Sequence, residues 1–299
     1  QFKKYPEWSA VQRNDEPGTP GSDSGSNYYW LDIANPEVQE FMLEIYKEQQ
    51  EDYKITGVNI DYIRYPHHSF DKSYGFSASN RERFEEEFGV DPMNLEESDE
   101  LWEEWELWLR EQENAFVEKL HDQSKGIDPA FMMTATPEPG PEAVLISDWV
   151  EDIDGVIPQA YGHDFNSIQS TVVASKKLTP PSMMYYTGIY SFYHHLGEKA
   201  AVNDVLAAAY GTSGVNMFAF GQASAPSVDA LGKGPWRNTA VNPGETPKEA
   251  VLATVKQLKE QTASIYIPKG AVDKREGKKL ENNLRKWEKM MDRPDHSLK

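Results

Sequence analysis

Two acidic residues stand where a parallel β-sheet would carry reactive groups. Asp61 ends one apolar run, and Glu138 comes just after a second one over residues 131–136. Parallel strands share one carboxyl edge, so we expect the two acids to face each other across a cleft. One would attack or act as base while the other donates a proton. There are structural alternatives for both acids. Asp61 could cap a loop or pair with Arg64, and Glu138 could be a solvated residue between two prolines.

Polar and aromatic side chains near these acids are candidates for binding a substrate. They are Asn59, Tyr62, Arg64 and Tyr65 around Asp61, Gln159, Tyr161 and His163 at the end of the run 155–161, and Trp236 after a Gly/Ser/Pro-rich stretch. Period-two alternation predicts that Gln159, Tyr161 and His163 point the same way. Their amide, phenol and imidazole groups suit hydrogen bonds to sugar hydroxyls, and a satisfied buried network is the alternative.

The sequence favours neither a metal nor a nucleotide cofactor. It has no cysteine, and its adjacent histidine pairs, His67-His68 and His194-His195, lack the i, i+4 spacing of a helical zinc site. It also lacks the glycine-rich phosphate motifs and the GxSxG elbow of serine hydrolases. We predict no cofactor, and a metal-dependent hydrolase stays open as an alternative.

The net charge narrows the classes of partner. The 299 residues carry a formal charge of −19, which disfavours nucleic acids and anionic membrane surfaces. No apolar run approaches the roughly 20 residues that span a bilayer. Only the stretch from Lys269 onward is basic, and a salt-bridged surface helix explains it. The sequence predicts neither a membrane span nor a particular oligomeric state.

Helical and strand patterns alternate along the chain. Helices are predicted over 36–53, 80–88, 99–124, 141–150, 166–176, 199–210, 246–261 and 276–291. Strands are predicted from Gly57 to Asp61 and over 131–136, 155–161, 182–190 and 214–221, with a possible short one at 263–267 and a loop over 222–236. Asn35-Pro36 marks the first helix start, and Trp102, Trp105 and Trp108 form an apolar stripe that is core rather than a sugar platform.

This alternation predicts an α/β fold with five parallel strands. A (β/α)8 barrel of the TIM type needs three more. The chain is therefore expected to be an N-terminally incomplete barrel, containing the equivalents of strands 4–8, or else an open sheet. We predict a barrel portion over 1–240 and a helical extension over 241–299.

The order of motifs resembles the bacterial glycosyl hydrolase-like family 10. The resemblance rests on the segments 29–32 and 35–38, followed by the segment 57–66. It extends to Ser147-Asp148-Trp149, 158–161 and 214–218. The resemblance implies a (β/α)8 barrel that cleaves glycosidic bonds, with Asp61 as the acid at the end of the fourth strand. It also implies a secreted or cell-envelope location, a carbohydrate substrate and, for some members, the glycan strands of peptidoglycan. A glycan-binding or scaffold barrel without catalysis is the alternative.

Overall fold

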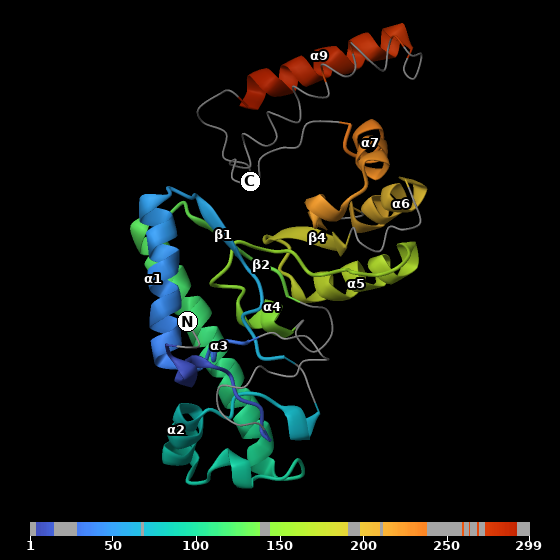
Figure 1. The fold of residues 1–299 in the computed structure, drawn as a ribbon. Coiled ribbons are helices and arrows are strands. Elements are labelled where there is room, and N and C mark those ends of the chain that lie inside the picture. The colour runs from blue at the N-terminus through green and yellow to red at the C-terminus, as the bar shows by residue number, and fades with distance from the viewer. Residues whose placement is uncertain are drawn as a thin grey trace. The chain divides into compact units, whose positions relative to one another are not determined.

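A computed structural model gives the fold of the protein (Figure 1). It describes residues 4–14, 29–66, 69–137, 144–190, 198–209, 212–237 and 273–291, and also residues 259, 263 and 268. The chain forms two compact units. The first contains Gln1–Tyr193 and Ala207–Phe220, and the second contains His194–Leu206 and Gly221–Lys299. The predicted boundary at residue 240, the helix over 246–261 and most of the short strand over 263–267 lie outside the described residues.

The first unit is organised around a parallel sheet of five strands. They are β1 (Gly57–Ile60), β2 (Met132–Ala135), β3 (Gly155–Val156), β4 (Met184–Tyr190) and β5 (Gly214–Phe218). Every pairing is parallel, and the strands lie side by side in chain order. Parallel pairing places all five carboxyl ends at one edge. The uninterrupted sequential order is that of a β/α barrel and differs from a doubly wound sheet, in which the strand order reverses. The predicted five parallel strands are confirmed; closure into eight is not seen among the described residues.

Two faces of this sheet have different surroundings. Helices cover one face: the Tyr185 hydroxyl donates to the Val172 carbonyl of α5 (Phe165–Leu178), and the Thr187 hydroxyl donates to Ala208 of α6 (Glu198–Ala209). Side chains on this face, such as Met133 and Val156, are fully buried. On the opposite face Asn59 is exposed, so β1 is buried on one face only. That face carries the polar side chains that chemistry needs.

Two long helices pack along each other beside the sheet (Figure 1). Helix α1 (Pro36–Asp52) begins where predicted, because the Asn35 side chain accepts the Glu37 N–H at 2.9 Å. Helix α3 (Glu100–Ile127) hydrogen-bonds to α1 through Gln39 and Gln50. Trp102, Trp105 and Trp108 of α3 are buried, which confirms that they are core.

The remaining helices are mostly as predicted, with one error. They are α2 (Ala78–Phe88), α4 (Val144–Asp148), α7 (Ala225–Lys233) and α9 (Lys274–Met291), with short 3-10 turns at Pro6–Trp8, Phe70–Lys72, Pro92–Asn94 and Phe220–Gln222. The loop predicted over 222–236 is wrong, because α7 lies there. Ser224 caps its first turn by accepting the Ser227 N–H, and Pro226 fits the first turn of a helix. Among the described residues, no helix has the length and apolarity needed to cross a membrane.

Candidate active site

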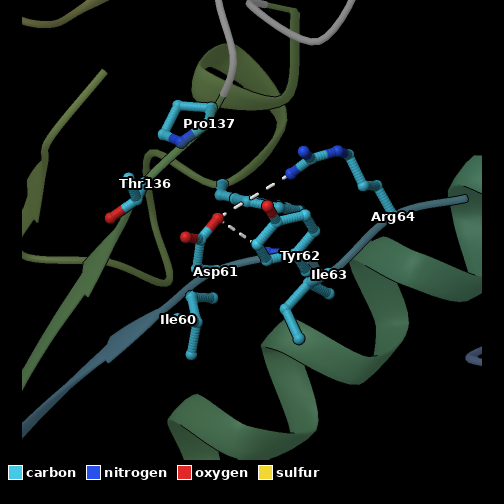
Figure 2. Close-up of a pocket in the computed structure, with 8 residues that line it drawn as sticks. Ile60, Asp61, Tyr62, Ile63, Arg64, Thr136 and Pro137 are labelled. Carbon is cyan, nitrogen blue, oxygen red and sulfur yellow. Dashed lines mark hydrogen bonds and ion pairs between the residues drawn. The ribbon is translucent and has the colours of Figure 1, made fainter. Parts of the chain in front are cut away.

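Asp61 is the first residue after β1, at the carboxyl edge of the sheet, as predicted. Its side chain is 34% exposed, and its Oδ1 atom contacts groups from two loops. It accepts the Tyr62 N–H at 2.8 Å and lies 3.8 Å from Arg64 Nη1 (Figure 2). It also accepts the Gln159 side-chain amide at 3.2 Å. Two hydrogen bonds and one ion pair therefore orient the carboxylate, and its side chain remains partly exposed.

Arg64 combines burial with contact to the acid. Its side chain is 8% exposed, its guanidinium lies 4.6 Å from the centre of the Tyr62 ring, and it pairs with Asp61. The ion pair between Asp61 and Arg64, expected as a structural alternative, is thus present. The Asp61 carboxylate is nevertheless accessible to solvent. Tyr62 has φ of 59°, an unfavourable backbone conformation for a tyrosine, and its ring is 58% exposed. Such local strain is common at functional sites.

Gln159 links the loops that follow two strands. Its buried side-chain amide donates to Asp61 Oδ1 and to the Thr136 carbonyl, each at 3.2 Å. Its backbone N–H donates to the Pro137 carbonyl at 3.1 Å. A small pocket opens beside this junction, lined by residues 60–64, Thr136, Pro137 and Trp149 (Figure 2). Asp61, Arg64 and Gln159 are thus brought together from positions up to 98 residues apart.

Asn59 belongs to a polar row on the open face of the sheet. Its Nδ2 donates to Thr136 Oγ1 at 2.7 Å, and its Oδ1 accepts from Thr134 Oγ1 at 2.9 Å. Asn59 precedes Asp61 by two residues, so the two side chains point to the same side of the strand. Exposed amide and hydroxyl groups next to a carboxylate are suited to recognising a ligand rich in hydroxyls.

Tyr65 lies in a buried network and not on the open face. Its hydroxyl donates to Asp32 Oδ1 and accepts the Ala34 N–H at 3.2 Å, while its own N–H donates to Glu113. Burial raises the pKa of Asp32 above 3.8, although hydrogen bonds from Ser77, Tyr65 and Asn80 oppose that shift. Burial, followed by the neighbouring Asp32 carboxylate, also raises the pKa of the Tyr65 phenol.

The three residues predicted to act together at the end of β3 have separate surroundings. Gln159 is buried against Asp61, Tyr161 is half-buried among aromatic rings, and His163 is exposed next to the helix cap Asp164. The strand ends at Val156 and is followed by one isolated bridge, so regular alternation does not continue to His163. Of these three predictions, the structure supports the placement of Gln159 next to Asp61.

Two other candidates cannot be joined to this site. Glu138 lies outside the described residues. Trp236 belongs to the second compact unit, where it is 38% exposed and its N–H donates to the Leu231 carbonyl. In the part of the chain that the structure describes, no three histidine or acidic side chains are placed to hold a metal ion.

Tyr190 and Phe218 were missed as candidates. Their rings stack at 5.9 Å between centroids, and Tyr161 lies 5.2 Å from Tyr190 and 6.4 Å from Phe218. Tyr190 and Phe218 end β4 and β5 and are paired in register. We call Tyr161, Tyr190 and Phe218 the strand-end trio. An aromatic residue at the carboxyl end of consecutive strands was the signal that could have revealed it.

Parallel strands in sequential order, with an oriented carboxylate at their carboxyl edge, define this protein as a member of the barrel-like α/β class. Comparison with known proteins gives the family. The model for glycosyl hydrolase-like 10 matches residues 1–198, about two thirds of the chain, and the chain belongs to that family. This agrees with the resemblance drawn from the motifs around Asp61.

Other comparisons add little. No curated protein matches the chain. An α-galactosidase from Lactobacillus brevis, known from its crystal structure, is 15% identical over 78% of this chain with a TM-score of 0.48. The chain spans 26% of the length of that protein. Such a likeness is too weak to support an argument about mechanism.

Proposed function

We propose that this protein is a glycoside hydrolase acting on a polysaccharide or other glycan, with Asp61 as its central acid. The supporting observation is the exposed Asp61 carboxylate, oriented by Gln159 and Arg64 at the carboxyl edge of a parallel sheet. Membership of a glycosyl hydrolase-like family agrees with this chemistry. In the same proposal, the five strands correspond to strands 4–8 of a (β/α)8 barrel, and the protein works outside the cytoplasm or in the cell envelope.

The reaction assigns one role to each acid. Asp61 attacks the anomeric carbon or activates a water molecule, and Glu138 protonates the leaving oxygen. Carboxylates about 5–5.5 Å apart would give retention of configuration, and about 6.5–9.5 Å would give inversion.

Substrate binding is assigned to the groups around this carboxylate. Asn59 and Tyr62 are exposed next to Asp61 and offer an amide and a phenol to sugar hydroxyls. The strand-end trio offers ring faces, on which the C–H face of a sugar can pack. His163 and Trp236 remain predicted contacts. Tyr65 takes no direct part, because its hydroxyl is already bonded to Asp32.

A panel of glycans, including peptide-free peptidoglycan, tests the proposal. We expect wild type to release reducing ends, and Asp61→Asn to lower turnover by about 10²- to 10⁴-fold. Asp122→Asn, which alters a carboxylate 75% exposed on α3, is the control and should keep full turnover. Turnover that survives Asp61→Asn would contradict the assignment of Asp61. Binding of saccharides with no turnover would favour a glycan-binding protein, and inhibition by chelators would favour a metal-dependent hydrolase.

A further inference from the structure

The stretch just before α1 contacts the Asp61 loop at two points. Trp30 packs on the exposed Tyr62, with 5.5 Å between ring centroids. Two residues later, Asp32 accepts the hydroxyl of Tyr65. One short segment therefore touches both ends of the loop from Tyr62 to Tyr65, although it lies about 30 residues away in sequence.

Asp32 is itself held firmly. It is fully buried, and Asn80 Nδ2 lies 2.9 Å from its Oδ1 and 3.1 Å from its Oδ2. Asn80 also donates to the Gly75 carbonyl at 3.0 Å, which connects the network to the chain before α2. A buried carboxylate that accepts several hydrogen bonds has one geometry, because each lost bond leaves a desolvated polar atom.

The other side of Tyr65 is fixed by a second acid. Its backbone N–H donates to Glu113 Oε1 of α3 at 2.9 Å, and Glu113 is 6% exposed. Side chain and backbone of Tyr65 are thus bonded to two different parts of the fold. Tyr65 directly follows Arg64, whose guanidinium pairs with Asp61. A shift of Tyr65 would displace Arg64 and change the direction of the Asp61 carboxylate.

We propose that Asp32 and Tyr65 are a positioning pair that fixes the loop 61–65, and through it the Asp61 carboxylate. The catalytic part of this inference rests on the proposed function, whereas the positioning of the loop does not. The pair itself touches no substrate. Its role differs from that of an ordinary core contact because its loss changes the loop more than the global stability.

Tyr65→Phe tests the pair because it removes only the hydroxyl, and Tyr185→Phe is its matched control. Tyr185 is also buried, and its hydroxyl donates to the Val172 carbonyl at 3.5 Å, on the helix-covered face of the sheet. Hydrogen exchange measured by mass spectrometry should show at least about tenfold faster exchange of the amides of residues 61–65 in Tyr65→Phe. Tyr185→Phe should leave these amides as in wild type.

Kinetics give the second measurement. With a cleaved glycan, Tyr65→Phe should lower kcat about tenfold and change KM less than about twofold, because orientation is lost and binding is kept. Glu113→Gln retains the acceptor oxygen and should behave as wild type, whereas Glu113→Ala should repeat the effect of Tyr65→Phe. Unchanged exchange over 61–65 in Tyr65→Phe overturns the positioning pair. Faster exchange in a protein that cleaves no glycan would support the pair and refute the proposed hydrolase.

Discussion

Two aromatic clusters of the protein have similar ring geometry and opposite exposure. In the helical cluster, Trp105 and Trp108 stack with 5.4 Å between centroids, packed against Phe84 of α2. In the strand-end trio, Tyr190 and Phe218 stack at 5.9 Å. Trp105 is 0% exposed and Phe218 is 52% exposed. Ring type and stacking therefore do not distinguish a core cluster from an exposed one; position in the fold does.

The difference follows from what lies over each ring. Helix α3 presents its tryptophans to α2 and the preceding loop, where burial of large apolar surface stabilises the fold. The strand-end trio stands at the carboxyl edge of the sheet, where Phe218 is exposed. An exposed ring adds little to folding, and we propose that this one contributes to ligand binding instead.

Removal of a ring from the helical cluster should have the largest effect on stability. We expect Trp105→Ala to lower the free energy of unfolding by about 3–5 kcal/mol, because the cavity cannot be filled by its neighbours. Chemical denaturation monitored by circular dichroism measures this. Trp105→Phe keeps a ring in place and should cost clearly less. If Trp105→Ala lowers the free energy of unfolding by less than about 1 kcal/mol, the helical cluster does not contribute to stability as we expect.

Removal of a ring from the strand-end trio should affect binding instead. Phe218→Ala should change the free energy of unfolding by about 0.5 kcal/mol or less and weaken affinity for a bound glycan about two- to tenfold, the value of one stacking contact. Calorimetric titration measures the affinity. Tyr53→Ala, at a ring 70% exposed after α1, is the control and should bind as wild type. If Phe218→Ala and wild type bind the glycan with equal affinity, Phe218 of the strand-end trio does not contribute to binding.

A smaller, pH-dependent effect is expected near the helical cluster. Hydrogen bonding by Arg81 lowers the pKa of Asp91 below 3.8 and joins α2 to the turn Pro92–Asn94. Because the pKa is lower in the folded state, the stabilisation is present above pH 3.8 and is lost as the pH falls through the folded pKa. The pair is partly exposed, so its contribution should be below about 1 kcal/mol.

Asp91→Asn should therefore lower stability at pH 7 and converge with wild type near pH 2. Denaturation curves at several pH values measure the difference. Glu44→Gln, which alters an exposed pair on α1, should show no such pH dependence. A stability difference that persists at the lowest pH would mean that Asp91 acts by packing rather than by charge.

Local signals were sufficient for most of the secondary structure. Asn35-Pro36 fixed the start of α1, Gly89 ended α2, and the alternation of helical and apolar segments located the five strands, because caps and periodicity act within a few residues. The same reasoning placed Asp61 at the carboxyl edge. It failed for α7, where glycine, serine and proline suggested a loop although Ser224 and Pro226 supply a helix start.

The sequence by itself therefore determined the order of elements, the parallel sheet and the acid at the end of β1. Tertiary structure alone decided which side chains meet that acid. Gln159 reaches Asp61 across 98 residues, Tyr65 turns to Asp32 rather than to the open face, and His163 is exposed next to a helix cap. Strand patterns fix which edge a residue occupies, but contacts between loops depend on packing of distant segments, which no short-range pattern encodes.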